Sequence, residues 1–289
     1  MLSVKVVPKQ RHGSHPAIRL LLLFLLAVGV LLAYRWQTAR VLPPVSIKIE
    51  QSSSQDWAHI LIPQNNCRLI NNVWNKAAAG NGFEQQIFSG ILDGKSMYGW
   101  RWRAPWHLTT RVVSQPQLVC GDKPWDEPLH LNPEFPFRAG SKKPSVNYNA
   151  RLDAKGTYNM AFSLWVVSSL PSSRNGITHE IMIWNANGGQ HPGGTKRDVI
   201  VVDGIPYDIY VEENHVDNSG QNGNHWTYVA FVAAQPLLRG HLDLGSFIDY
   251  LLQRGILTSN HYVTSLEFGN EVSEGSGIVE IRDFSLSLN

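Results

Sequence analysis

Short apolar or alternating runs recur along most of the chain, separated by Gly, Pro, Asn or Asp. From Trp57 onwards such runs begin about every 8–15 residues, as expected for short strands joined by turns. Examples are "YNMAFSLWVV", "HEIMIW", "VVDGIPYDIYV" and "WTYVAFVA". About a dozen strands in one domain are typical of a β-sandwich or jelly roll. The pattern therefore predicts an all-β domain over residues 57–289.

One segment departs from strand periodicity and has helical spacing. In "DLGSFIDYLLQRGI", the apolar residues Leu244, Phe247, Ile248, Leu251 and Leu252 form one stripe. We predict that this segment is the only substantial helix of the domain. Upstream of the domain, residues 41–56 combine Pro and Ser with a short alternating run, which indicates a linker that includes one edge strand.

The N-terminus combines basic residues with an unbroken apolar run, Leu20–Tyr34. A run of this length suits a signal peptide and is shorter than the about 17–25 residues of a membrane span, unless Ala17 and Ile18 extend it past Arg19. We interpret residues 1–40 as a hydrophobic signal-anchor helix, with a cleaved signal peptide as the alternative. On either interpretation the body of the protein is exported, and the anchored form is held at a membrane.

Charge and cysteine content narrow the class of partner. Residues 1–40 hold six basic and no acidic residues, so the remainder carries 19 basic against 23 acidic residues. The body shows no basic face, which argues against nucleic acid as a partner. The two cysteines, Cys67 and Cys120, suit an oxidising compartment. We expect them to form a disulfide, with two buried free thiols as the alternative.

The strand within "GITHEIMIWNANGG" places unlike side chains on its two faces. With a period of two, Glu180, Met182 and Trp184 share one face, and Ile181 and Ile183 share the other. In a sandwich the Ile face must form the core between the sheets. The other face suits the lining of a sugar-binding groove, although a covering loop and a paired structural carboxylate would also explain it.

A second acidic candidate ends the penultimate predicted strand, in "SLEFGNEVSEGSG". Glu267, Gly269 and Glu271 share one face, and Gly269 is expected to leave room for a ligand. Two carboxylates facing one groove are what glycoside hydrolysis requires, because one must be ionised and the other protonated.

Aromatic residues provide candidate sugar platforms. Trp74 lies in the polar stretch "NNVWN", which favours stacking against a ligand. The alternating Tyr98, Trp100 and Trp102 are interpreted as core rather than cleft.

Metal binding and phosphate binding have little support in the sequence. The histidines lack metal-ligand spacing, and His215 and His225 are interpreted as loop residues. "NGGQHPGGTK" lacks the pattern of a phosphate-binding loop. We expect no metal and no cofactor, and a monomeric protein.

Taken together, these stretches resemble glycoside hydrolase family 12, the small retaining endo-β-1,4-glucanases and xyloglucanases. The resemblance covers roughly residues 65–289 and includes "NNVWN", "MYGWRW", "HEIMIW", "VVDGIPYDIYV" and the C-terminal "LEFGNEVSEGSGIVEIRDFSLSLN". It implies a jelly-roll β-sandwich of two antiparallel sheets with one helix, in which the concave sheet forms an open glycan-binding cleft.

The resemblance also implies roles for individual residues. Glu180 matches the family's nucleophile and Glu271 its acid/base. Trp74 matches the aromatic platform on the non-reducing side of the cut. Asn72 and Met182 match residues close to the cleaved sugar.

The sequence departs from the family pattern at three places. Val272 and Ser273 follow the acid/base, where the family usually has Pro and an aromatic residue. Glu267 stands where Gln is common. Ser163 stands where the family usually has an Asp beside the nucleophile, so Ser163→Asp is expected to accelerate the enzyme, unless a repacked site makes the new charge harmful.

These observations favour an exported endo-glycosidase that cleaves internal β-1,4 bonds of a β-glucan with retention. The substrate would be cellulose, mixed-linkage glucan or xyloglucan. The alternatives are a polysaccharide-binding protein on the same fold, weakened in catalysis by the change at Ser163, and a structural interaction protein. The third alternative leaves the paired acids unexplained.

Overall fold

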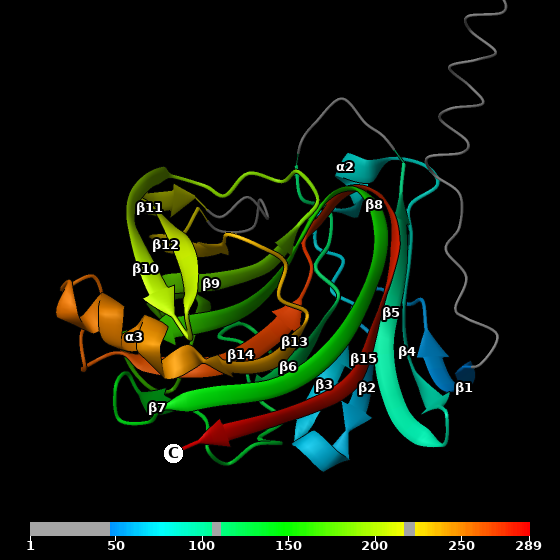
Figure 1. The fold of residues 1–289 in the computed structure, drawn as a ribbon, viewed down its shortest axis with the longest axis horizontal. Helices are drawn as coiled ribbons and strands as arrows, with labels where there is room; N and C mark the ends of the chain where they lie inside the picture. Colours follow the sequence, from blue (N-terminus) through cyan, green and yellow to red (C-terminus); the bar gives the residue numbers. More distant parts are fainter. Residues whose placement is uncertain (1–46, 106–110, 217–222) are drawn as a thin grey trace, which may run out of the picture. The chain divides into compact units, whose positions relative to one another are not determined.

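The computed structural model describes residues 47–105, 111–216 and 223–289. Most of these residues form strands, arranged in two sheets (Figure 1). The first sheet has the order β1 (Ile47–Ser53), β4 (Glu84–Leu92), β5 (Lys95–Ala104), β15 (Val272–Leu288), the first part of β8 (Pro144–Val167), and β13 (Arg239–Asp243). The predicted jelly roll is confirmed, and β1 places part of the expected linker at the sheet edge.

The second sheet carries the candidate site. Its order is β2 (His59–Ile62), β3 (Cys67–Ile70), β6 (Gln117–Gly121), β14 (Tyr262–Gly269), the second part of β8, β9 (Ile177–Asn187), β12 (His225–Ala233), β11 (Ile205–Val216) and β10 (Thr195–Val202). The short β7 (Phe137–Arg138) also pairs with β14. Short 3-10 turns, η1 (Pro63–Asn65) and η2 (Arg174–Gly176), precede β3 and β9.

Strand β8 belongs to both sheets, and paired glycines allow it to change partners. Gly156 of β8 lies opposite Gly275 of β15, and both have positive φ angles, of 108° and 100°. A Cβ on Gly275 would lie 1.9 Å from the carbonyl oxygen of Lys155, so no side chain fits there. The close approach lets the long strands bend together, as Figure 1 shows for β8 in green and β15 in red.

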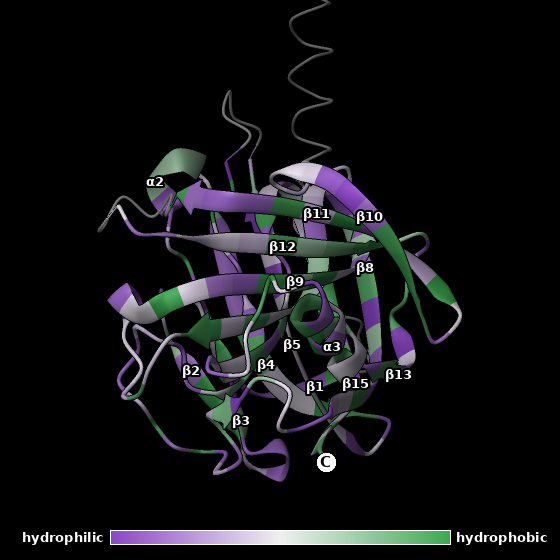
Figure 2. Cartoon of the chain, turned by 90° about the vertical axis from the view of Figure 1, so that its left-hand side faces the viewer, coloured by the Kyte–Doolittle hydropathy of each residue, from purple (hydrophilic) through white to green (hydrophobic). Residues whose placement is uncertain are grey.

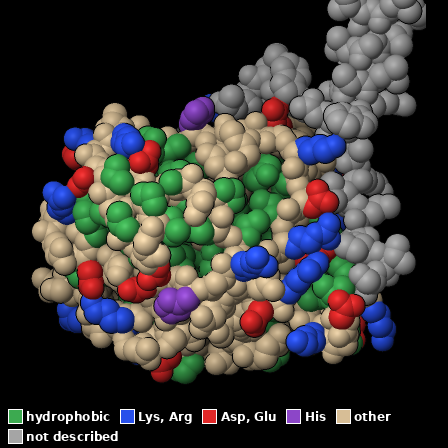
Figure 3. All heavy atoms as spheres, in the orientation of Figure 1, with side chains coloured by type: hydrophobic (Ala, Val, Ile, Leu, Met, Phe, Trp, Pro, Cys, Tyr) green, Lys and Arg blue, Asp and Glu red, His purple; other side chains and the backbone are tan. Residues whose placement is uncertain are grey.

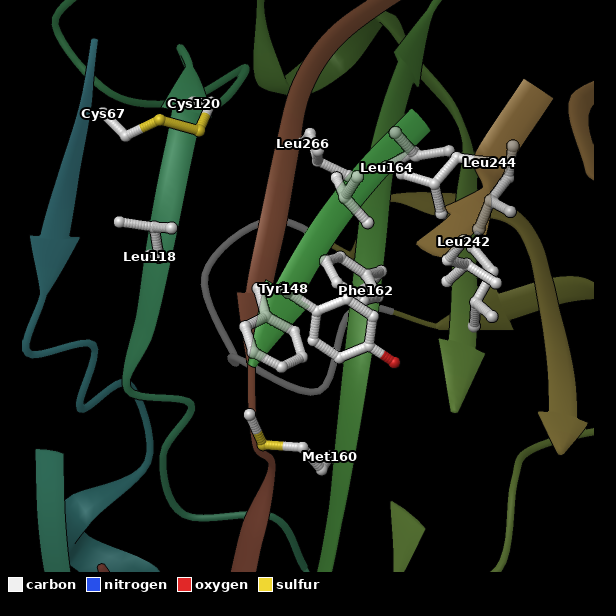
Figure 4. Packing of buried hydrophobic residues seen from close by; sticks show 14 of the residues in the cluster. Cys67, Leu118, Cys120, Tyr148, Met160, Phe162, Leu164, Leu242, Leu244 and Leu266 are labelled. Carbon is white, nitrogen blue, oxygen red and sulfur yellow. A yellow bond between two sulfur atoms is a disulfide. The ribbon is translucent and has the colours of Figure 1, made fainter. Parts of the chain in front are cut away.

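The core between the sheets is built from the faces that the alternation predicts. The Phe162 and Phe268 rings stack with their centroids 4.3 Å apart, and Tyr148 meets both rings edge-on. Figure 4 shows Tyr148 and Phe162 within this core. Ile181 and Ile183 are fully buried in this core. The aromatic residues predicted to be core, Tyr98, Trp100 and Trp102, belong to the same cluster.

The predicted helix is confirmed as α3 (Leu244–Gln253). Its N-terminus is capped by Asp243, whose side chain accepts a hydrogen bond from the Ser246 amide. Phe247 packs its ring 4.9 Å from those of Tyr207 and Phe231, which fixes the helix against the second sheet. The other described α-helix, α2 (Lys76–Ala79), is a single turn.

One strand pair differs from the expectation of two purely antiparallel sheets. β9 and β12 lie next to each other in the sheet (Figure 2). They run parallel, with Glu180 beside Tyr228 and Trp184 beside Val232. The reason is the connection after β9, which crosses over β12 and β11 to reach β10 at the edge. Gly194 allows this crossing, because its φ is +77° and a Cβ on it would lie 2.2 Å from the Val211 carbonyl oxygen of β11. The crossing segment thereby becomes a wall of the site.

The predicted disulfide between Cys67 and Cys120 is confirmed. The two residues lie opposite each other on β3 and β6 and join strands at one end of the second sheet. By the chain-entropy account, closing a loop of this length stabilises the fold by about 4 kcal/mol.

Surface charge is mixed on the face shown in Figure 3. Apolar side chains gather near its centre, and Lys, Arg, Asp and Glu side chains lie mostly around the margin, with both signs interspersed. The apolar run Leu20–Tyr34 lies outside the described residues, and within them no helix is long and apolar enough to cross a membrane.

Candidate active site

A cavity of about 560 Å³ opens over the second sheet, next to Glu180 and Glu271. Its lining is dominated by aromatic rings: Trp57, Trp74, Trp125, Trp165, Trp184, Trp226 and Tyr228. Aromatic faces separated by polar groups are typical of surfaces that bind sugar rings. The cavity therefore has the chemistry expected of a glycan cleft.

Glu180 lies on β9, on the cavity side of the strand. Trp165 of β8 and Tyr228 of β12 are its direct cross-strand neighbours. The indole Nε1 of Trp226 donates a hydrogen bond to Glu180 Oε2 at 3.1 Å. This bond fixes one carboxylate oxygen and leaves the other available for reaction.

Glu271 lies in the two-residue connection between β14 and β15, where Asn159 holds it at three points. The Asn159 side-chain amide donates to Glu271 Oε2, the Glu271 amide donates to Asn159 Oδ1 at 2.9 Å, and the Asn159 amide donates to the Glu271 carbonyl at 3.1 Å. Gln190, from the segment after β9, donates to the same Oε2 at 2.9 Å. Because both side-chain bonds end on Oε2, Oε1 is the oxygen able to carry a proton.

The two carboxyl groups influence each other's protonation. Burial, together with the charge of Glu271, raises the pKa of Glu180 to about 8, against the hydrogen bond from Trp226. Burial raises the pKa of Glu271 to about 7, while hydrogen bonds from Asn159 and Gln190 lower it. The pair therefore titrates as a unit that holds one proton near neutrality. The higher pKa of Glu180 places this proton more often on Glu180 than on Glu271 in the free protein, so acid and nucleophile chemistry requires the proton to move to Glu271.

Trp74 and Asn72 lie where a sugar-binding role places them. Both line the cavity, and Trp74 is half-buried between β3 and α2. Asn72 is buried, its carbonyl accepts a hydrogen bond from the Gln115 amide, and its side-chain Oδ1 has no partner among the described residues. That oxygen is therefore a buried acceptor beside the cavity with no partner among the described residues.

We expect Trp74→Ala to weaken binding of a gluco-oligosaccharide about tenfold, or about 1.4 kcal/mol, through loss of one stacking surface. Isothermal titration on a variant inactivated at Glu180 measures this without turnover. Trp57→Ala removes another ring of the same cavity and serves for comparison. An unchanged affinity in Trp74→Ala, with the fold intact, would assign Trp74 a packing role only.

Two residues expected at the sugar, Met182 and Ser163, do not line the cavity. Trp184 does line it, but Met182 is fully buried beneath it, among Ala161, Trp184 and other rings. Ser163 is buried opposite Met182, while Trp165 occupies the position opposite Glu180. The expectation that Ser163 faces the cleft directly beside the nucleophile is therefore wrong. Ser163 is buried, two residues along β8 from the position opposite Glu180.

The register of β8 against β14 also predicts the effect of Ser163→Asp. Ser163 lies directly opposite Glu267 on β14, and its hydroxyl has no partner among the described residues. An added Asp would place a second buried carboxylate beside Glu267 and raise the pKa of Glu180 further. We expect Ser163→Asp to lower kcat/KM about tenfold and Ser163→Ala to change it little. A faster Ser163→Asp enzyme in pH–rate profiles would contradict this.

Glu267 and Gly269 are not groove residues either. Glu267 is buried and forms an ion pair with Lys123, 2.8 Å away. A Cβ on Gly269 would lie 2.5 Å from the Gln117 Cβ, so this glycine admits the neighbouring strand β6 rather than a ligand. The expectation that Gly269 leaves room for a ligand is therefore wrong.

Val272 follows Glu271 and is one of the residues that depart from the family pattern. It has a structural role. Its amide donates to the Ser114 carbonyl at 3.0 Å, and its carbonyl accepts from the Val113 amide at 2.8 Å. Proline could not donate the first bond. These bonds tie the segment at residues 113–114 to the base of the Glu271 connection.

The sequence pattern did not mark several residues of the site. They are Gln190, Trp226 and His215, which line the cavity, and Asn159, which holds Glu271. His215, predicted to be in a loop, lies on β11 and stacks on Tyr228 with ring centroids 5.2 Å apart. The register of β11 against β12 shifts between Glu212 and His215. Because this shift interrupts the alternation of side chains, the sequence pattern did not predict that His215 belongs to the strand. Within the described part of the chain, no group of three or more His, Cys, Asp or Glu could hold a metal ion.

The fold and this cavity together define a jelly-roll protein with a carboxylate pair set in an aromatic, glycan-type cleft. A family model described as glycosyl hydrolase family 12 matches residues 66–289. The chain belongs to this family, as the resemblance indicated.

Individual relatives agree with this assignment. Endoglucanase S of Pectobacterium parmentieri is 28% identical over 240 residues, which cover 82% of this chain and 87% of the relative. A family 12 xyloglucanase structure from Bacillus licheniformis superposes with a TM-score of 0.73 at 26% identity, covering 83% of this chain and all of that one. A Phytophthora nicotianae protein named as an inactive glycoside hydrolase is 28% identical over 230 residues, covering 76% of this chain and 86% of that protein.

Proposed function

We propose that this protein is an endo-acting glycoside hydrolase that cleaves internal β-1,4-glucosidic bonds of a β-glucan with retention of configuration. The observation that carries the proposal is the pair Glu180 and Glu271. Both line one aromatic cavity, and each is held by its own hydrogen-bond donors. The relatives named as endoglucanase and xyloglucanase support the substrate class.

The proposed reaction uses the two carboxyl groups in turn. Ionised Glu180 attacks the anomeric carbon and forms a glycosyl ester, while protonated Glu271 transfers its proton to the departing glycosidic oxygen. Glu271, now ionised, takes a proton from water as the water attacks the anomeric carbon. The ester to Glu180 then breaks, and both groups return to their starting states.

We expect a bell-shaped dependence of kcat/KM on pH, with its maximum near neutral or slightly alkaline pH. Both carboxyl pKa values are raised, so the singly protonated pair is populated at higher pH than for ordinary carboxyl groups. Initial rates on barley β-glucan across the pH range measure this. A maximum below about pH 5, where ordinary carboxyl groups titrate, would contradict the shared burial of the pair.

A polysaccharide-binding protein without turnover is the second candidate, because Ser163 departs from the family pattern and one relative is named inactive. Reducing-end release from cellulose, barley β-glucan and xyloglucan separates the two candidates and identifies the preferred glucan. Release from any of these by wild type, but not by Glu180→Gln, supports the hydrolase. Binding without release supports the alternative.

We also propose that the domain acts outside the cytoplasm, either released or anchored by residues 1–40. The basic, apolar N-terminus and the disulfide between Cys67 and Cys120 support export. Fractionation of cells expressing the full chain, with and without residues 1–40, tests this. Equal recovery of both forms in the cytoplasm would contradict it.

A further inference from the structure

A lysine–glutamate ion pair is buried beside the cavity. Lys123 Nζ lies 2.8 Å from Glu267 Oε1, and each side chain is 1% exposed. With its amide oriented to suit both neighbours, Gln117 accepts from Lys123 at 2.8 Å and donates to Glu267 Oε2 at 2.9 Å. Removing two charges from water costs free energy that their attraction often fails to recover, so stability alone does not explain this pair.

The loop that carries Lys123 is held rigidly from beneath. Buried Arg68 of β3 donates to Asp122 at 3.0 Å and to Asp126 at 3.1 Å, on either side of Lys123. Gly121, which begins the loop, has φ +86°, and a Cβ there would lie 2.5 Å from the Thr264 carbonyl oxygen. These constraints fix the loop in the conformation that brings Lys123 to the cavity lining.

A continuous row of rings leads from Lys123 to the proposed nucleophile. Lys123 Nζ lies 4.7 Å from the centre of the Trp125 ring, which meets Trp165 edge-on at 4.8 Å. Trp165 meets Trp226 at 5.4 Å, and Trp226 donates its hydrogen bond to Glu180. The ion pair, the cavity wall and the nucleophile thus form one packed unit.

Glu267 approaches the same carboxylate from the floor of the sheet. It lies opposite Ser163, which lies opposite Met182, two residues along β9 from Glu180. Two anions, Glu271 and Glu267, raise the pKa of Glu180, while the cation Lys123 lowers it. The other charged or titratable groups around this cavity are Arg111, Asp126, Arg174, His191, His215 and Tyr228.

We propose that Lys123 and Glu267 act as a positioning pair for the active site: Glu267 holds the ammonium group of Lys123 at the cavity wall and limits the positive charge that reaches Glu180. The inference deepens the proposed function and rests on it for its catalytic meaning. The electrostatic effect of Lys123 and Glu267 on Glu180 can be measured without turnover.

The test compares Glu267→Gln with the double variant Lys123→Met/Glu267→Gln in the full chain. Gln keeps the shape of Glu267 but removes its charge, so Glu180 then experiences Lys123 uncompensated. We expect the Glu180 titration to move down by about one pH unit in Glu267→Gln. In the double variant it should return towards the wild-type value, because the cation is also removed.

The readout is the ¹³C signal of glutamate side-chain carboxyl carbons, with Glu180 assigned by its loss in Glu180→Gln. The acidic limb of kcat/KM on β-glucan should move in the same direction. Glu280→Gln is the matched control, because Glu280 is also buried and paired, with Arg151 at 3.0 Å and Arg282, but lies on the first sheet away from the cavity. It should alter stability without moving the Glu180 titration.

The inference is overturned if Glu267→Gln leaves the Glu180 titration in place in a folded protein, or if Glu280→Gln moves it equally. It is also overturned if the double variant does not reverse the shift. If wild type releases no reducing ends from any glucan, the proposed hydrolase function fails, while the titrations still decide the role of the ion pair.

Discussion

Replacing Glu180 with Gln is expected to lower turnover of β-glucan on the order of 10⁴-fold and to leave oligosaccharide binding within about threefold of wild type. The amide matches the carboxylate in shape, and its oxygen can still accept the hydrogen bond that Trp226 donates to Glu180 Oε2. It cannot form the glycosyl ester, so the reaction stops before the first bond is broken. Reducing-end assays and titration calorimetry with a cello-oligosaccharide measure the two quantities separately.

The same substitution has a pH-dependent effect on stability. The folded-state pKa of Glu180 lies above its unfolded value. The contribution of this group to the free energy of unfolding is therefore fully present at acid pH and is lost as pH rises through about 8. Gln does not titrate and escapes this loss. The melting temperature of Glu180→Gln relative to wild type should therefore rise between acid and alkaline pH. Near-wild-type turnover of the variant would exclude Glu180 as the nucleophile.

The strand pattern predicted the sandwich because burial on one face imposes a period of two. Ile181 and Ile183 on the core face of β9, with Glu180 on the cavity face, follow directly from that period. The parallel pairing of β9 with β12 could not be predicted in this way, because it depends on where the connection after β9 crosses the sheet. Alternation fixes the face of a residue but not the identity of its neighbouring strand.

The same limit explains which site residues were predicted correctly. Glu180, Glu271 and Trp74 line the cavity as expected, whereas Ser163 and Met182 share their predicted face but lie too deep to reach it. Depth depends on the size of neighbouring side chains, here Trp165 and Trp184, which cover the floor. A sequence pattern carries no such information.

The residues that hold the carboxylates were missed for a related reason. Asn159, Gln190 and Trp226 come from three different segments and meet Glu271 or Glu180 only through the folded arrangement. Each is polar or aromatic in a local context that suits an ordinary strand or turn. Their function depends on tertiary contacts, and neither composition nor spacing marks them.

Replacing Glu271 with Ala should separate its roles as acid and base. On natural glucans, whose leaving groups need a proton, we expect kcat/KM to fall about a thousandfold. On an aryl cellobioside with a strongly acidic phenol as leaving group, the first step needs little protonation and should fall about tenfold or less. The glycosyl ester on Glu180 should then accumulate, because water attacks it slowly without a base. Equal losses on the two substrates would argue against the acid role.

Azide makes this prediction stereochemically specific. As an anionic nucleophile, azide needs no general base, so it should accelerate turnover of the aryl substrate by Glu271→Ala. It must approach the ester from the face opposite Glu180, and two inversions therefore give a β-glycosyl azide. The matched control is Glu274→Ala. Glu274 also accepts a hydrogen bond, from Thr157 Oγ1 at 3.2 Å, but does not line the cavity. Azide should leave that variant's rate unchanged, and an α-azide from Glu271→Ala would contradict retention through Glu180.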